Sequence, residues 1–356
     1  MKSSRAPLLL VLAIAGLFLL YTYGVKPFER LALEGYYQII IKNRVAHKNV
    51  LTQQEVFQLG IYRPELPYQF SQLYAMQESL GVRFSIVSYY QAWGDEPDNM
   101  FKTRVNRNLT RGGFVPLITW EPWIAGFKGY KGQNPEASLH LLASGAFDGY
   151  IRSWAREAVR FGKPFFLRPG HEMSNPWYSW SQQYGNTPGA FKAFWQRVYR
   201  LFQEEGARNA AFVWNPYTPA DTAFYPGDDF VDWIGLDIFN FGSLSQEGIW
   251  MDFYITTKLL YDAVKFANKP ILVAETGCAA AGGNKNNWYR DMFHSLAAGN
   301  FPLIKALVLF DTPLAITPTG ISVDLGFSGD SAVYGAVNRS EFTEKLHIQS
   351  LQKGTE

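Results

Sequence analysis

Cysteine and histidine are scarce in this chain. Its 356 residues include one cysteine, Cys278, and five histidines. A single cysteine excludes a framework of intrachain disulfides, and it does not indicate a compartment, because many exported bacterial enzymes lack disulfides. So few histidines and cysteines also leave little for a dedicated metal site, and we expect none.

A strong charge bias is also missing. The formal net charge is +2 and the sequence contains no basic stripe, so nucleic acid is not an expected partner. Aromatic residues, by contrast, are abundant: they make up 16% of the chain and include 11 tryptophans. This content exceeds what packing needs and favours flat ligands with apolar faces, such as sugar rings.

The N-terminus carries one long apolar run. Lys2 and Arg5 precede an uncharged segment over residues 6–23, whose 18 residues would roughly span a bilayer core of about 30 Å as a helix. The basic residues ahead of it predict an N-terminus inside the cell and an exported remainder. We therefore assign residues 1–24 to a signal anchor and residues 25–53 to a juxtamembrane linker.

A cleaved signal peptide is the alternative for this segment. Residues 13–15 read Ala-Ile-Ala, the small-x-small form of a cleavage site. Cleavage there would leave a very short hydrophobic region, since the site lies inside the apolar run. An uncleaved anchor is therefore the favoured interpretation.

Beyond the linker, short apolar runs alternate with amphipathic segments, which is the βαβ pattern. The strand candidates are residues 56–62, 83–90, 114–120, 164–169, 210–215, 231–237, 270–276 and 304–310. The pattern predicts a (β/α)8 TIM barrel over residues 54–350. A doubly wound open sheet is the alternative, but no Gly-rich dinucleotide fingerprint follows the first strand.

Residues 168–177 read RPGHEMSNPW and raise the question of a metal. The zinc-protease motif H-E-x-x-H requires a second histidine on the same helix face as the first. After His171 and Glu172 that position is Asn175, and the flanking prolines and glycine disfavour a helix. A zinc protease is therefore excluded.

Two glutamates stand where the active site of a (β/α)8 barrel is built, at the C-terminal ends of strands. Glu172 follows the fourth strand and Glu275 ends the seventh. Across one barrel mouth they would form the pair of a retaining glycosidase, with carboxyl groups about 5–5.5 Å apart. The acid needs an apolar wall, which Trp177 and Trp180 would supply. The plainer interpretation is that each glutamate pairs with an arginine at the rim.

The motifs together resemble glycoside hydrolase family 26. They read RPGHEMxxxWYxW, FVWNP, YPGDDFVDWIGLD and KPILVAETG, preceded by TWEPW and GAFDGYI. The resemblance extends over about residues 57–310. It implies a barrel, retention of configuration and no cofactor. Most members are β-mannanases, and others act on mixed-linkage β-glucan or β-1,3-xylan.

The resemblance also implies roles for residues around the scissile bond. Glu172 matches the acid/base and Glu275 the nucleophile. His171 matches the histidine beside the acid/base, which hydrogen-bonds in the subsite of the scissile bond. Arg168 matches the arginine that supports the nucleophile. A histidine buried in the core is the alternative for His171.

Other positions match the substrate cleft. By resemblance Trp177 is an aromatic residue of the cleft, and Trp120 and Glu121 belong to the third-strand motif on the glycone side. Asp237 ends the sixth strand, where we expect it to line the cleft. Phe239 stands where the family often has a tyrosine that hydrogen-bonds near the nucleophile.

Several departures from the family pattern concern the central subsite. The usual HEMNG is HEMSN here, with Ser174 and Asn175 in the turn after the acid. Phe239 lacks a hydroxyl donor, and Leu309 and Phe310 stand where a tryptophan platform is common. These changes leave the choice among mannan, β-glucan and β-1,3-xylan open.

The sequence therefore predicts a membrane-anchored, exported endo-glycosidase, with β-1,4-mannan as the first candidate substrate. A β-glucan hydrolase linked to exopolysaccharide processing is the main alternative. A non-catalytic polysaccharide-binding or assembly subunit, tethered beside the polysaccharide-synthesis machinery, is the alternative from another class.

Overall fold

A computed structural model describes residues 46–52, 57–133, 135–245, 247–316 and 320–338. The predicted anchor, residues 1–24, lies outside the described residues, as does most of the predicted linker. Within the described ranges no helix is both long enough and apolar enough to cross a membrane.

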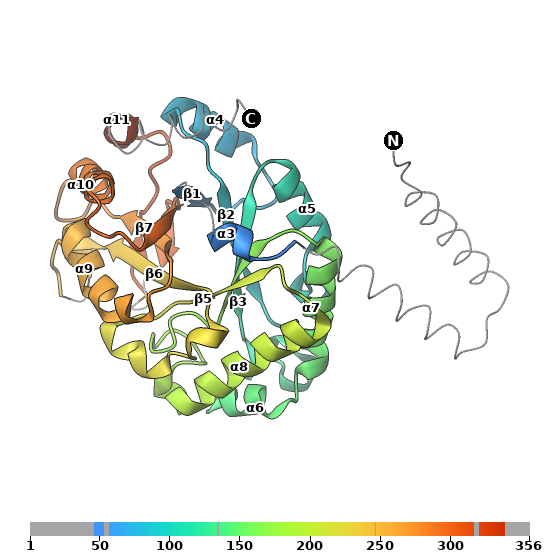
Figure 1. Cartoon of the computed structure of the whole chain (residues 1–356). Helices are drawn as coiled ribbons and strands as arrows, with labels where there is room; N and C mark the ends of the chain where they lie inside the picture. The colour runs from blue at the N-terminus through green and yellow to red at the C-terminus, as the bar shows by residue number, and fades with distance from the viewer. Residues whose placement is uncertain (1–45, 53–56, 134, 246, 317–319, 339–356) are drawn as a thin grey trace, which may run out of the picture. The chain divides into compact units, whose positions relative to one another are not determined.

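The strands close into a barrel in which each pairs in parallel with its neighbours in sequence (Figure 1). They are β1 (Gln58–Tyr62), β2 (Ile86–Ala92), β3 (Val115–Glu121), β4 (Phe165–Pro169), β5 (Ala210–Trp214), β6 (Trp233–Asn240), β7 (Ile271–Cys278) and β8 (Ile304–Phe310). Strand β8 pairs with β1 and completes the ring. The predicted (β/α)8 barrel is confirmed, and the alternative of an open sheet is wrong.

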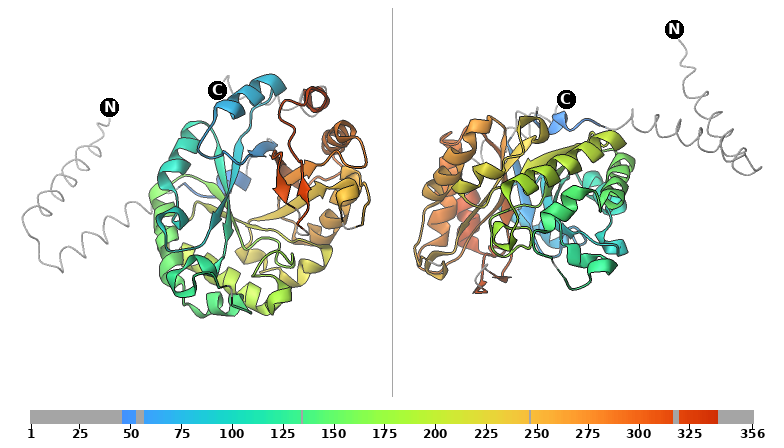
Figure 2. Two further views of the ribbon diagram at one scale, coloured as in Figure 1. Left: turned by 180° about the vertical axis from the view of Figure 1, so that it is seen from behind. Right: turned by 90° about the horizontal axis from the view of Figure 1, so that it is seen from below.

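Helices form a ring around the barrel, seen from behind and from below in Figure 2. They are α4 (Ser71–Leu80), α5 (Thr103–Arg111), α6 (Ser138–Ser144), α7 (Asp148–Phe161), α8 (Pro188–Glu205), α9 (Phe253–Val264), α10 (Lys285–Ala297) and α11 (Ser331–Asn338). Between β5 and β6 the chain instead forms 3-10 helices, η5 (Pro219–Phe224) and η6 (Asp228–Phe230).

Side chains fill the barrel, and this explains the uninterrupted apolar runs of the sequence. All residues of β4, β5 and β7 are buried, because both faces of these strands are covered. The cluster at the centre comprises Ile86, Leu117, Phe166, Ala211, Val213, Trp233, Leu272, Ala274, Ala306 and Val308. It forms the floor beneath the strands' C-terminal ends.

The short helix α3 (Asn49–Thr52) lies across the middle of the barrel in Figure 1. Its Leu51 is 2% exposed and belongs to the central cluster. The Nζ atom of Lys48 lies 2.8 Å from Oδ2 of Asp232, just before β6. Residues 46–52, which the sequence analysis placed in the linker, therefore contact the barrel at the N-terminal ends of its strands.

We expect Leu51→Ala to lower the free energy of unfolding by about 2–5 kcal/mol, the usual cost of removing a buried leucine side chain. The matched control is Val50→Ala in the same helix, because Val50 is 45% exposed; a surface change of this kind stays within about 0.5 kcal/mol. Equilibrium urea unfolding followed by tryptophan fluorescence measures both. Equal effects of the two variants would show that α3 does not stabilise the barrel.

Candidate active site

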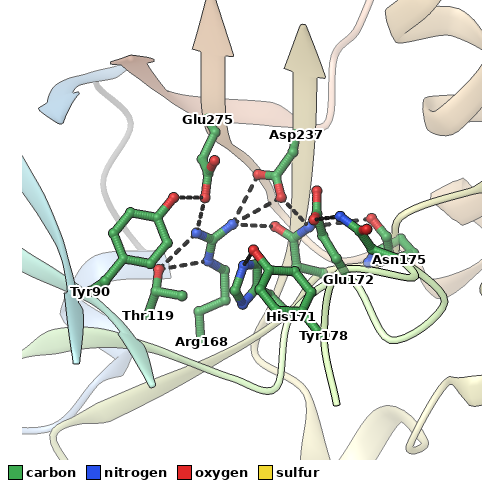
Figure 3. Close-up of polar contacts among 11 residues, drawn as sticks. Tyr90, Thr119, Arg168, His171, Glu172, Asn175, Tyr178, Asp237 and Glu275 are labelled. Atoms are coloured by element: carbon green, nitrogen blue, oxygen red, sulfur yellow. Dashed lines mark hydrogen bonds and ion pairs between the residues drawn. The ribbon is translucent and has the colours of Figure 1, made fainter. Parts of the chain in front are cut away.

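Polar side chains from several strands meet at the C-terminal end of the barrel (Figure 3). On one side, Tyr90 of β2 pairs with Thr119 of β3, and Thr119 pairs with Arg168 of β4. On the other side, Asp237 of β6 pairs with Glu275 of β7. Hydrogen bonds to Arg168 and Glu275 join these five side chains into one polar layer above the apolar cluster.

The guanidinium of Arg168 lies at the centre of this layer and is completely buried. Its Nη1 donates to both carboxylate oxygens of Asp237, at 2.9 and 3.1 Å, and its Nη2 donates to Oε1 of Glu275. Nε and Nη2 also donate to Oγ1 of Thr119, at 3.0 and 2.7 Å. Two carboxylates and several acceptors thus compensate a cation that is costly to bury alone.

Glu172 lies in the turn after β4, with its backbone in the left-handed region at φ 50°. Such a conformation costs a non-glycine residue on the order of 1–3 kcal/mol and is found where the surroundings impose it. Here the Glu172 N–H donates to the carbonyl of Asn215 at 2.9 Å, and the Asn175 N–H donates to the Glu172 carbonyl at 2.9 Å. These bonds hold the turn from which the Glu172 side chain reaches the pocket that Glu275 also lines.

The two glutamates have different environments. Burial raises the pKa of Glu172 to about 7, and the negative charge of Glu275 acts in the same direction. The Nδ2 group of Asn175 donates to Oε2 of Glu172 at 2.7 Å, which opposes this rise. Oε1 of Glu275 instead accepts hydrogen bonds from the guanidinium of Arg168 and from the hydroxyl of Tyr90. One carboxyl is therefore set to carry a proton near neutral pH, and the other is paired with a cation.

His171 is buried behind the site. Its Nε2 lies 2.9 Å from the hydroxyl of Tyr178, and its backbone carbonyl accepts a hydrogen bond from Nε1 of Trp180 at 2.8 Å. Burial and the positive charge of Arg168 hold the pKa of His171 well below its usual range, so the ring is neutral. Tyr178 lines the pocket, and His171 thus orients a pocket hydroxyl.

A pocket of about 420 Å³ opens above the polar layer. One wall carries hydrogen-bonding and aromatic groups and consists of Tyr90, Glu172, Asn175, Trp177, Tyr178, Tyr217 and Glu275. The rest of the lining is mostly apolar and includes Phe239, Phe241, Phe310, Leu314, Ile316 and Leu325. Trp177 is 50% exposed at the rim, where its indole is free to stack on a sugar ring.

The pocket contains four of the nine site residues predicted from the sequence. Glu172, Glu275, Trp177 and Phe239 line it, whereas Arg168 and Asp237 lie in the polar layer below. Trp120 does not reach the pocket. Its ring is completely buried, 4.5 Å from that of Trp93 and 4.3 Å from that of Trp154 between their centroids.

Trp180 and Glu121 have supporting positions. The ring of Trp180 is buried and stacks on Tyr178 at 4.4 Å. Burial raises the pKa of Glu121 to about 7, and the charges of Arg168 and Glu275 act on it in opposite directions. Glu121, at the end of β3, is therefore close enough to Arg168 and Glu275 for their charges to affect its pKa.

Phe239 and Phe310 occupy the positions at which the sequence departs from the family pattern. Their rings pack edge to face at 5.3 Å, and Phe239 stacks on Phe241 at 5.5 Å. Leu309 is 1% exposed and belongs to the core. The wall at the ends of β6 and β8 therefore presents phenyl rings to the pocket.

Sequence reasoning missed Tyr90, Asn215 and Tyr217. Tyr90 and Asn215 each end a predicted strand, so the strand-end rule would have found both. Tyr217 lies in an irregular loop, where the sequence carries no comparable signal. In the described part of the chain, no group of three or more His, Cys, Asp or Glu residues is arranged to hold a metal ion.

Comparison with known proteins connects this geometry to a family. The model of "Glycosyl hydrolase family 26" matches residues 146–299, which include Glu172 and Glu275. "Endoglucanase H" of Acetivibrio thermocellus is 29% identical over 67% of this chain and 26% of its own length. A "Mannan endo-1,4-beta-mannosidase" of Bacillus subtilis strain 168 is 28% identical over 43% of this chain and 39% of its own length. The chain thus spans well under half the length of these curated relatives.

Solved structures of the family share the fold. A family 26 β-mannanase from Bacteroides ovatus superimposes with a TM-score of 0.59 over 87% of this chain and 93% of its own, at 12% identity. A modular endo-β-1,4-mannanase from Cellulomonas fimi gives a TM-score of 0.60 over 85% and 79%, at 14% identity. Identities this low show the barrel alone. Over residues 146–299 the chain thus resembles glycoside hydrolase family 26 in sequence, and over most of its described length it shares the barrel of these solved structures.

Proposed function

We propose that this protein is a retaining endo-β-glycosidase that cleaves internal linkages of a polysaccharide. One observation carries the proposal: Glu172, with a pKa raised to about 7, and Glu275, ion-paired with Arg168, line the same pocket. Two carboxyl groups in unlike environments are what a double displacement at an anomeric carbon requires.

In the first step a carboxylate oxygen of Glu275 bonds to the anomeric carbon while the glycosidic bond breaks. The proton of Glu172 goes to the departing oxygen. In the second step a water oxygen bonds to the same carbon, its proton goes to Glu172, and the ester bond breaks so that its electron pair returns to Glu275. The two steps balance without a cofactor.

β-1,4-Mannan is the proposed first substrate, and β-glucan is the main alternative. The relatives named above include a mannan endo-1,4-β-mannosidase and an endoglucanase, and others are named β-1,3-xylanases. Trp177 and Tyr217 offer rings at the pocket, and Asn175 lies beside the acid. An open pocket flanked by exposed rings suits binding within a polymer rather than at its end.

The site of action follows from the sequence as a further part of this proposal. An anchor over residues 1–24 would hold the barrel at the outer face of the membrane. There the enzyme could trim a polysaccharide during its export. The polysaccharide-synthesis machinery is the corresponding partner. Under the alternative of a binding or assembly subunit, the same pocket would hold the polymer without cleaving it.

The first test is hydrolysis of galactomannan, mixed-linkage β-glucan, laminarin and β-1,3-xylan, followed by the reducing ends released. We expect one polymer to be cleaved, and Glu275→Ala and Glu172→Ala each to lower kcat by at least about 10²–10⁴-fold, the scale of general acid catalysis. The control is Glu78→Gln, an exposed carboxylate on α4, which should keep wild-type rates.

Adding azide to the two alanine variants tests which glutamate is the nucleophile and which is the acid/base. It should restore glycosyl transfer in Glu172→Ala with retention of configuration and in Glu275→Ala with inversion, because it replaces a different group in each. Retained wild-type turnover in either folded variant would contradict the proposed roles. A wild-type protein that binds a polymer and cleaves none would identify the binding subunit.

The pKa of Glu172 predicts the pH dependence. The acid must be protonated, so kcat/KM should fall as the pH rises above about 7. Asn175→Ala removes a donor that stabilises the ionised form, so the pKa of Glu172 should rise further. The alkaline limb should then move upward by up to roughly one pH unit, since one hydrogen bond contributes about 1 kcal/mol.

Ser174→Ala is the matched control for this change, because the Ser174 hydroxyl bonds Oδ2 of Asp221 at 2.9 Å and not Glu172. Its kcat/KM profile should follow that of the wild type. An alkaline limb that stays in place in Asn175→Ala would show that another group sets it.

A further inference from the structure

Tyr90 contacts Glu275 from the opposite side of the barrel. It lies in β2, two residues before the strand ends at Ala92, and its hydroxyl donates to Oε1 of Glu275. Arg168 donates to the same oxygen. In the described part of the chain, the hydrogen bonds to the Glu275 side chain all end on Oε1. The other oxygen, Oε2, is therefore left to face the pocket.

The ring of Tyr90 is fixed by its neighbours. Tyr62 packs edge-on against it at 5.3 Å, with an angle of 89° between the ring planes. Tyr62 in turn stacks on Phe310 at 4.3 Å. Register with Thr119, which itself binds Arg168, fixes the height of the Tyr90 backbone. The hydroxyl is thus held in place by packing and by the sheet.

The hydroxyl also stays protonated. Burial and the negative charge of Glu275 hold the pKa of Tyr90 well above its usual range. Tyr90 is therefore a hydrogen-bond donor to Glu275 and not a base near neutral pH.

We propose that Tyr90 is a positioning residue that, together with Arg168, holds Oε1 of Glu275 so that Oε2 attacks the anomeric carbon. This inference rests on the proposed glycosidase function. After the attack Oε1 is the carbonyl oxygen of the glycosyl ester, and it keeps both donors. When water displaces the sugar, the C1–Oε2 bond breaks, its electron pair returns to the carboxylate, and the two donors stabilise the charge that develops.

The assignment predicts which step depends on Tyr90. Without the hydroxyl, the carboxylate of Glu275 is a poorer leaving group, so hydrolysis of the ester slows more than its formation. The neighbouring positions at the ends of β6 and β8 do not replace the donor, because Phe239 and Phe310 present phenyl rings to this pocket.

The test is Tyr90→Phe, which keeps the ring and its packing and removes only the hydroxyl. The substrate is a dinitrophenyl β-glycoside of the oligosaccharide that the wild type releases, for which breakdown of the intermediate limits the rate. We expect kcat to fall roughly ten- to a hundredfold, the effect of one hydrogen bond to a charged group. KM should fall with it, so that kcat/KM changes much less. Mass spectrometry of the quenched reaction should show the glycosyl-enzyme accumulating.

Tyr89→Phe is the matched control. Tyr89 precedes Tyr90 in β2, but its side chain is directed to the other face of the strand, where its hydroxyl donates to Oδ1 of Asn106 at 2.9 Å. This variant should keep the wild-type kcat and KM, whatever stability it loses.

Two results would overturn the assignment, and they are distinct from failure of the proposed function. Unchanged kinetics in Tyr90→Phe would show that the hydroxyl does not assist Glu275. A parallel loss in kcat and kcat/KM without accumulated intermediate would show a general structural role. A wild-type protein without turnover or covalent adduct on any of the four polymers or their aryl glycosides would overturn the glycosidase itself.

Discussion

The site depends on one buried cation. Arg168 is completely buried, and its guanidinium donates hydrogen bonds to Asp237, Glu275, Thr119 and Asn215. A guanidinium presents its donors in a rigid fork, so every partner must be at a fixed height and angle. The closed barrel supplies this, because it brings residues of β3, β6 and β7 around Arg168 of β4. Loss of either carboxylate partner would leave charge uncompensated in a medium that solvates it poorly.

The two glutamates differ in their surroundings, since Glu275 belongs to the polar layer around Arg168 and Glu172 lies in the turn after β4. Glu275 has a cation and a hydroxyl on one oxygen, whereas Glu172 lies in a left-handed turn with one amide donor and a raised pKa. The strain of that turn is offset by backbone bonds to Asn215 and Asn175. The surroundings thus favour a protonated Glu172 and an ionised Glu275. Such a difference between two carboxyl groups is the basis of paired-carboxylate chemistry.

The pocket combines two unlike walls. On one side hydroxyl, amide and carboxyl groups accompany the exposed indole of Trp177. On the other, phenyl rings from the ends of β6 and β8 pack with β9 (Ala315–Ile316) and β10 (Ser322–Val323). A sugar ring has polar edges and apolar faces, and both walls offer suitable contacts. Under the proposed function, the choice between mannose and glucose would rest on single hydroxyl contacts within such a pocket.

The sequence by itself determined the barrel and the two glutamates. Strands covered on both faces appear as apolar runs, and strand ends mark where the chemistry lies, so Glu172 and Glu275 followed from local pattern. Only the tertiary structure decided which aromatic residues reach the pocket. Trp120 and Trp177 are alike in sequence, yet one is buried between other indoles and the other is half exposed. The hydrogen bond between Tyr90 and Glu275, 185 residues apart, came only from the tertiary structure, because the closed ring of strands brings β2 and β7 to one site.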